Sequence, residues 1–179
     1  MHPAAPDRNG SVGALAARVG FLFSSRVMKI SVTRQATRSR VVSSREVERA
    51  AAAMLRALKL GRAELSVVLC DDATIHALNR DYRKKDKATD VLAFALREGE
   101  WGHLAGDALG DVIISLDTAT RQARERKIAA RDEVKMLLAH GLLHLVGWDH
   151  RTDAEDRRMR AEVERLLRTV ARAERRAST

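Results

Sequence analysis

The chain has 179 residues, 45% of them hydrophobic, which suits one domain with a core of ordinary size and short extensions. Its formal net charge of +9 favours an anionic partner such as nucleic acid, although a merely soluble basic surface explains the charge equally well. No apolar run approaches the roughly 18 residues of a membrane span. Cys70 is the one cysteine, which excludes an internal disulfide and fits a reducing cytoplasm, where we expect the protein to act.

The first segment, residues 1–27, shows no helical or strand periodicity. We expect it to be a disordered extension, or the result of a start codon placed too early, with Met28 opening the domain. A secretory signal is disfavoured because Arg18 interrupts the apolar run and no small-residue cleavage pattern follows.

The stretch at 27–33 mixes β-branched and polar residues and is the first predicted strand. The next element is a helix over 45–60, capped by Ser43 or Ser44 and stopped by Gly61, because its apolar residues recur at helical spacing. A buried strand at 63–71, which includes Cys70, a helix at 71–83 and a strand at 89–96 follow in chain order.

The second half begins with a strand at 109–115 and continues with amphipathic helices at 116–127, 130–146 and 152–176, the last capped by Thr152 or Asp153. Four strands mixed with five helices predict an α/β (α+β) fold. We expect a single domain whose mixed four-stranded sheet packs against about five helices.

The most informative stretch is HGLLHLVGWDH, which places His140, His144 and His150 within eleven residues. The first two are four residues apart on a predicted helix, so both imidazoles leave the same face one turn apart. Gly147 can end that helix in the left-handed conformation and let the chain return His150 to the same point. Three histidines with one open position form the typical catalytic zinc site, although imidazole also suits nickel, copper or iron.

The spacing resembles that of zinc peptidases, but Gly141 stands where a peptidase carries its glutamate base. The glycine either allows close packing against a neighbouring element or leaves space beside the metal. Asp149 is expected to orient a ligand or to cap the next helix rather than to act as a base. Trp148 is expected to fill the core or to line a pocket.

Together with LNRDYRKKDKATDVLAFAL and LGDVIIS, this motif resembles the YbeY family of bacterial metal-dependent endoribonucleases of rRNA maturation, over roughly residues 28–173. The family signature reads H-G-x-L-H-L-x-G-(aromatic)-D-H. Ala93 and Ala95 depart from the serine and proline usual in the family, and Trp148 replaces a more usual tyrosine. The resemblance leaves 1–27 as an extension and 174–179 as a basic tail.

The resemblance implies that His140, His144 and His150 bind one zinc ion and that Arg83 is functionally important. A guanidinium suits a phosphodiester whose oxygens gain charge in the transition state, whereas the alternative is a solvated helix-end arginine. The implied activity is cleavage of single-stranded RNA in 16S rRNA 3′-end maturation and ribosome quality control. The implied partners are small-subunit ribosomal proteins and an assembly GTPase, with no membrane.

Two other functions remain open at this point. A zinc-containing ribosome-assembly factor without catalytic activity would show the same motif, and a zinc peptidase would share the ligand spacing. The RNA grip is expected to depend mainly on phosphate contacts, because aromatic residues make up only 3% of the chain. The lysines near Arg83, in KKDK, either follow the RNA backbone or keep the loop soluble.

Overall fold

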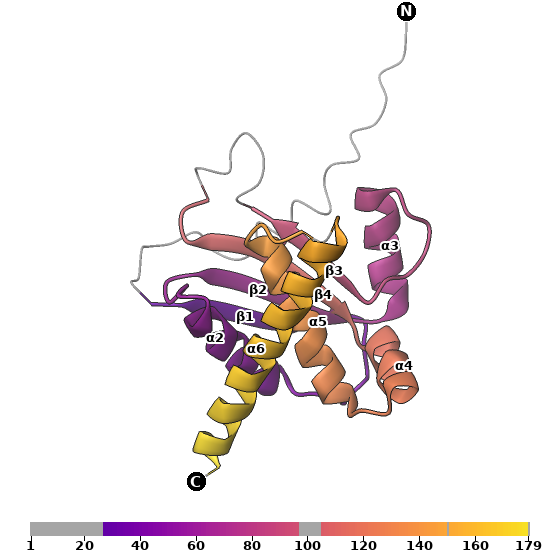
Figure 1. Ribbon diagram of the computed structural model, residues 1–179. Coiled ribbons are helices and arrows are strands. Elements are labelled where there is room, and N and C mark those ends of the chain that lie inside the picture. Colours follow the sequence, from indigo (N-terminus) through magenta and orange to yellow (C-terminus); the bar gives the residue numbers. More distant parts are fainter. Residues whose placement is uncertain (1–26, 97–104, 150, 179) are drawn as a thin grey trace, which may run out of the picture.

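The structure is a computed structural model that describes residues 27–96, 105–149 and 151–178. It confirms the predicted α/β fold, in which helices pack on a four-stranded sheet (Figure 1). The strands are β1 (Lys29–Arg34), β2 (Glu64–Cys70), β3 (Val91–Ala95) and β4 (Ala108–Ser115). The helices are α2 (Ser44–Ala57), α3 (Asp72–Arg83), α4 (Leu116–Arg126), α5 (Ala130–Leu145) and α6 (Asp153–Ala177).

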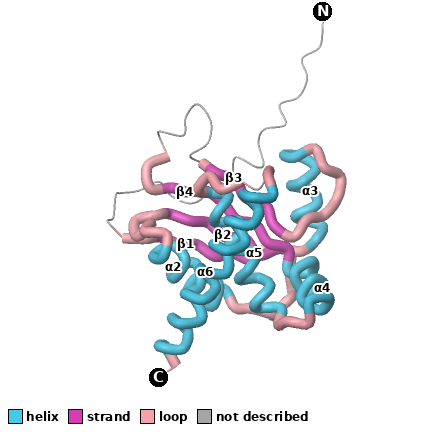
Figure 2. The backbone as a smooth tube through the Cα atoms, in the orientation of Figure 1, coloured by secondary structure: helices cyan, strands magenta, loops and turns pink. Residues whose placement is uncertain are grey.

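The strand order is β1-β2-β4-β3. β1, β2 and β4 run parallel, and β3 runs antiparallel to β4 at the edge of the sheet. Figure 2 shows the strands with the helices around them. Strands β2 and β4 are central and rich in Val, Leu and Ile, as expected of strands covered on both faces. The position of β3 matters for function because an edge strand offers one row of backbone groups to other parts of the chain.

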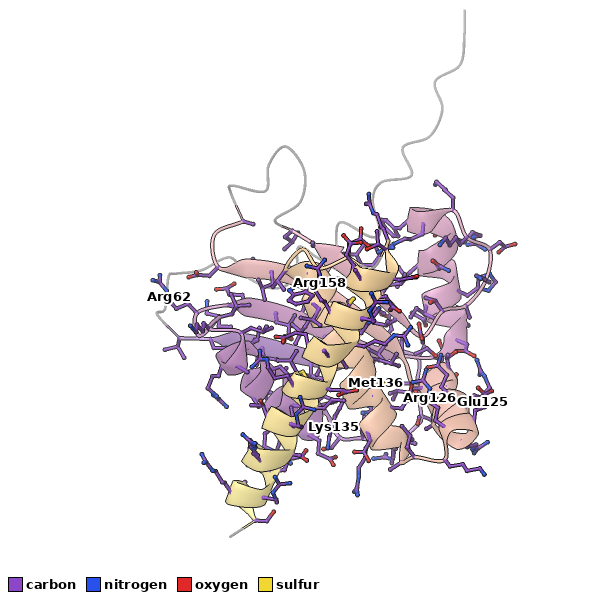
Figure 3. The ribbon with its side chains drawn as sticks, in the orientation of Figure 1. Arg62, Glu125, Arg126, Lys135, Met136 and Arg158 are labelled. Atoms are coloured by element: carbon purple, nitrogen blue, oxygen red, sulfur yellow. The ribbon has the colours of Figure 1, made fainter. Side chains whose placement is uncertain are left out.

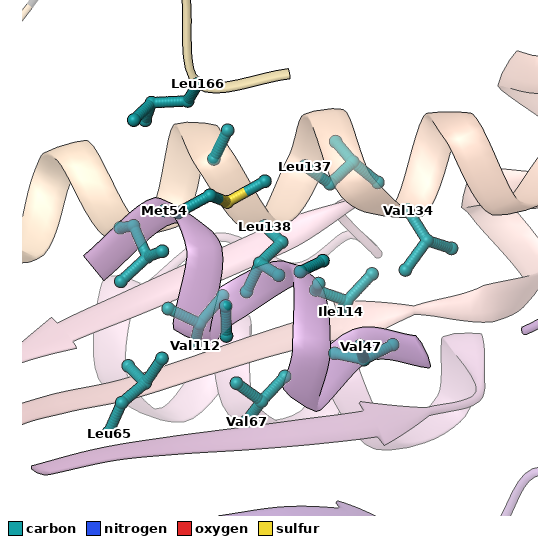
Figure 4. Close-up of a cluster of buried hydrophobic side chains, with 14 of the residues drawn as sticks. Val47, Met54, Leu65, Val67, Val112, Ile114, Val134, Leu137, Leu138 and Leu166 are labelled. Carbon is teal, nitrogen blue, oxygen red and sulfur yellow. The ribbon is translucent and has the colours of Figure 1, made fainter. Parts of the chain in front are cut away.

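Two layers of helix cover the sheet. Helices α2, α5 and α6 form the main core on one face, where side chains from β2, β4, α2 and α5 meet (Figure 4). On the other face, α3 covers a smaller cluster built on Cys70, Ile75, Leu92 and Ile113. Strand β3 serves both layers, because its alternating side chains pack on opposite faces.

Helix α2 ends at Ala57, so the prediction that Gly61 stops it was wrong. The left-handed residue is Lys59, with φ of 61°. Its N–H donates to the carbonyl of Arg56, and the N–H of Leu60 donates to that of Leu55. These paired bonds form a Schellman motif, whose hydrogen bonds and packing offset the roughly 1–2 kcal/mol cost of a left-handed lysine.

Helix α6 starts from a capping box in which Thr152 and Glu155 bond each other's backbone N–H. Its predicted apolar stripe is buried at Met159, Val163 and Leu166. The helix continues to Ala177, through residues that the sequence analysis assigned to a basic tail. Among the described helices, none is both long enough and apolar enough to cross a membrane.

Candidate metal centre

The histidine-bearing helix α5 lies unusually close to the sheet at Gly141. A Cβ atom added there would lie 2.7 Å from Cγ1 of Val112 on β4 and 3.3 Å from Cγ2 of Val91 on β3. Real Cβ atoms essentially never come that close to a neighbour, so any other residue would force the Val112 side chain to move. Close packing is therefore the reason for Gly141, and the alternative that it leaves space beside a metal was wrong.

The four-residue spacing on α5 brings two imidazoles together one helical turn apart. Nε2 of His140 and Nε2 of His144 are 3.2 Å apart, with ring centroids at 4.7 Å and an interplanar angle of 80°. Two nitrogens bound at 2.0–2.1 Å to one tetrahedral zinc ion lie roughly 3.3 Å apart. The separation of the two nitrogens is therefore compatible with binding to the same ion.

The end of α5 follows the predicted glycine turn. Gly147 has φ of 85°, its N–H donates to the carbonyl of His144, and the N–H of Trp148 donates to that of Leu143. This is a second Schellman motif, and Trp148 packs partly buried against the main core, as predicted. The chain thus leaves the helix in a fixed direction immediately after the second histidine.

The third predicted ligand, His150, lies outside the described residues. Within the described part of the chain, no group of three His, Cys, Asp or Glu side chains is arranged to hold a metal ion. Asp149 forms an ion pair with Arg151, Oδ2 to Nε at 2.5 Å. The cap of α6 is Thr152, so the suggestion that Asp149 caps that helix was wrong.

Arg83 ends α3 and reaches the edge of the sheet. Its Nη2 donates to the carbonyl oxygen of Ala93 on β3 at 3.1 Å, and the residue is exposed. The same strand contacts α5 through Val91, two residues earlier. Strand β3 therefore links the predicted arginine to the histidine helix, with Arg83 at its edge and α5 on its face.

The loop after Arg83 is held by a residue that the sequence analysis did not single out. Asn79 is buried, its backbone carbonyl accepts from Lys85 N–H at 3.2 Å, and its Nδ2 donates to the carbonyl of Lys87 at 2.8 Å. Asp86 pairs with His76 at 2.8 Å. The signal was the position of the asparagine in α3, about one turn before the end of the helix.

At the start of β3, Asp90 accepts from the backbone N–H of Val91 at 2.8 Å and from the hydroxyl of Thr89 at 3.2 Å. Its other oxygen accepts from Nε2 of Gln122 on α4 at 3.0 Å. These bonds fix the loop where it joins the strand.

A buried carboxylate on α5 was also missed. Glu133 is fully buried and accepts from Nη1 of Arg126 at 2.7 Å; burial raises its pKa, and the arginine opposes the shift. Nη1 of Arg126 also lies 3.5 Å from the sulfur of Met136; both residues are labelled in Figure 3. A cavity of about 480 Å³ between α5, α6 and β3 is lined by Arg126, Met136 and His140 among others. The available signal was that Glu133 lies two helical turns before His140.

Comparisons with known proteins show which family the chain resembles. The family model described as Endoribonuclease YbeY matches residues 30–171. The chain is 44% identical over 137 residues to the Endoribonuclease YbeY of Geobacter sulfurreducens, covering 75% of this chain and 91% of that protein. It is 46% identical over 130 residues to the Endoribonuclease YbeY of Aquifex aeolicus, covering 73% and 85%.

The solution structure of a Thermotoga maritima protein shares the fold, with a TM-score of 0.57, 23% identity, and coverage of 83% of this chain and 93% of that one. The family match covers all the described strands and helices apart from the first residue of β1 and the last residues of α6. It includes Arg83, His140, His144 and His150. The chain belongs to the endoribonuclease YbeY family.

Proposed function

We propose that the protein is a zinc-dependent endoribonuclease that cleaves single-stranded RNA. The observation that carries the proposal is the His140–His144 pair, whose Nε2 atoms are 3.2 Å apart on a helix held against the sheet. Family membership points to RNA as the substrate, and the net charge of +9 suits a polyanion. A peptidase is disfavoured because Val112 fills the space next to Gly141, and no carboxylate stands at that position.

Each residue has a defined task in this proposal. His140 and His144, with His150 as the third ligand, hold one zinc ion by neutral imidazole nitrogens. A bound zinc ion supplies Lewis acidity toward a phosphate oxygen. Arg83, which is anchored through one of its nitrogens to Ala93, offers its remaining N–H groups to the charge that develops on the scissile phosphate.

The proposed biological role is 16S rRNA 3′-end maturation and ribosome quality control in the cytoplasm. Small-subunit ribosomal proteins and an assembly GTPase are the proposed partners, by resemblance to the family. These assignments would place the cleavage activity on a large ribonucleoprotein, where a basic single-domain enzyme gains affinity from the surrounding phosphates.

The decisive experiment combines metal analysis with cleavage of an end-labelled, unstructured RNA by the purified full chain. We expect about one zinc ion per chain, cleavage that a chelator abolishes, and recovery when zinc is added back. A fully metallated protein that leaves the RNA intact would contradict the nuclease proposal. That result would favour the assembly factor, which would still bind rRNA and retain its metal.

A further inference from the structure

Tyr82, the one tyrosine of the chain, is exposed at the last turn of α3 although it is held in place. Its side chain is 48% exposed. Its ring meets that of Phe94 on β3 edge-on, with centroids 5.4 Å apart and an interplanar angle of 69°. Phe94 is itself half-buried against the smaller core cluster. The contact fixes the tyrosine ring and leaves a large part of it open to solvent.

The surroundings of Tyr82 are strongly basic. Residues 80–87 carry five basic and two acidic side chains, a net charge of +3. Both carboxylates are already engaged, because Asp81 pairs with Arg80 at 3.1 Å and Asp86 with His76 at 2.8 Å. The basic side chains of Arg83, Lys84, Lys85 and Lys87 form no ion pair with the described residues. Their charge is available to an anionic ligand.

Packing alone explains the inner part of the Tyr82 ring but not the retained exposure within a cationic surface. A fixed aromatic ring flanked by cations is the arrangement by which proteins bind single-stranded nucleic acids, the ring stacking on a base and the cations following the phosphates. Single exposed aliphatic residues are ordinary on protein surfaces. An aromatic ring braced by a second ring and next to a proposed phosphate contact is a more specific arrangement.

We propose that Tyr82, braced by Phe94, is a base-stacking subsite for single-stranded RNA whose backbone follows Arg83 and Lys85. The inference rests on the proposed function and adds to it the path that the bound RNA takes across the protein surface. Arg83 bonds the carbonyl of Ala93, the neighbour of Phe94, so the phosphate contact and the base contact meet on β3. The RNA would then cross the edge of β3 from α3 toward the histidine helix.

The test measures binding without cleavage, with chelator present and fluorescence anisotropy as the readout. The probes are a labelled oligoadenylate of ten nucleotides and, as competitor, inorganic polyphosphate, which carries charge but no bases. Tyr82→Ala should weaken RNA binding by roughly 10-fold or more, the scale of one lost base–aromatic stack. Tyr82→Phe should bind nearly as wild type, because it keeps the ring. The affinity for polyphosphate, measured by competition, should be the same for wild type, Tyr82→Ala and Tyr82→Phe.

Ile128→Ala is the matched control, because Ile128 is also a large exposed hydrophobic residue, at 44% exposure, but lies between α4 and α5. If Tyr82→Ala fails to fold, Tyr82→Leu keeps an apolar contact with Phe94 but has no ring, and it should show the same selective loss. Equal RNA binding by wild type and the ring-free variant would overturn the subsite, as would a parallel loss for polyphosphate. Either result leaves the nuclease proposal standing, since that depends on cleavage by the metallated wild type.

Discussion

Helices α5 and α3 pack against opposite faces of the sheet at the edge strand β3, and their C-terminal ends are built in different ways. Both helices are labelled in Figure 1. The C-terminal half of α5 carries two half-buried histidines, and most of the residues around them in the helix are buried. Gly141 leaves no space for a side chain against Val112. The end of α3 carries exposed basic residues around Arg83, fixed mainly through hydrogen bonds to the backbone. A metal needs ligands placed within tenths of an ångström, which packing supplies. A polyanion needs available charge, which an open surface supplies.

The largest effect should come from the α5 side. His144→Ala removes one of the two imidazoles whose Nε2 atoms are 3.2 Å apart, so zinc binding and RNA cleavage should both be lost. Metal analysis of the purified variant measures the first and RNA cleavage the second. His76→Ala, which removes a half-buried histidine of α3 that pairs with Asp86, should retain both. Stoichiometric zinc in the His144 variant would show that the ligand assignment is wrong.

On the α3 side, Arg83→Ala should separate metal binding from chemistry. Zinc content and melting temperature should stay near wild type, because the side chain is exposed and makes one hydrogen bond to Ala93. Single-turnover cleavage should fall by roughly 100-fold, the scale of losing one preorganised donor. Arg83→Lys should recover only part of the rate, because an ammonium lacks the planar fork.

Arg80→Ala is the control for this prediction, since Arg80 lies on the same helix and pairs with Asp81. It should leave the cleavage rate close to that of wild type. Full-rate cleavage by Arg83→Ala would return Arg83 to the role of a solvated residue at a helix end and would confine the chemistry to the α5 side.

The two regions also differ in what their sequence predicts. Local rules gave the order of the elements, the caps at Ser43 and Thr152 and the turn at Gly147, because each depends on residues close in sequence. The reason for Gly141 depends on Val112, which no local pattern connects with it. The brace between Tyr82 and Phe94 depends in the same way on how the loop after α3 returns to β3.

The ends of elements were harder to predict than their existence. The sequence analysis expected Gly61 to stop α2, whereas Lys59 ends it in the left-handed conformation, because the hydrogen bonds of the turn outweigh a modest local preference. The ion pair between buried Glu133 and exposed Arg126 was missed for a related reason. Both residues read as members of solvated charged faces until α4 and α5 are placed side by side.

A smaller effect than those at His144 and Arg83 should follow from crowding the close contact between Gly141 of α5 and the sheet. Gly141→Ala places a methyl group 2.7 Å from Val112, and overpacking of this kind typically costs about 1–3 kcal/mol. The higher helix propensity of alanine relative to glycine offsets about 1 kcal/mol of this cost. Denaturant unfolding measures the net loss, and zinc affinity should fall with it. The double variant Gly141→Ala with Val112→Ala should recover zinc affinity, because it removes the clashing methyl groups. Unchanged zinc affinity in Gly141→Ala would mean that the histidine pair does not depend on the close packing of α5 against the sheet.

The smallest effect concerns the fixed end of α3, which tests whether the helix is anchored away from its RNA-facing end. Asp72 accepts from the hydroxyls of Ser115 at 2.5 Å and Thr118 at 2.7 Å and from Nη1 of Arg121 at 2.7 Å. Burial alone would raise the pKa of Asp72, but these hydrogen bonds outweigh it and hold the pKa below its ordinary value. Asp72→Asn should therefore lower the free energy of unfolding at pH 7 by about 1.5 kcal/mol or somewhat more, the usual worth of hydrogen bonds to a charged group.

The pH dependence gives this prediction its sign. Because the folded state lowers the pKa of Asp72, the stabilisation is complete well above the ordinary value of about 4 and is lost as the pH falls through the lower, folded value. The difference in unfolding free energy between wild type and Asp72→Asn should thus narrow as the pH falls from 7 toward 3.5. Asp81→Asn, on the exposed part of the same helix, should differ from wild type by only a few tenths of a kcal/mol. A constant difference across this range would mean that the carboxylate charge does not anchor α3, and that the helix is held by its apolar cluster alone.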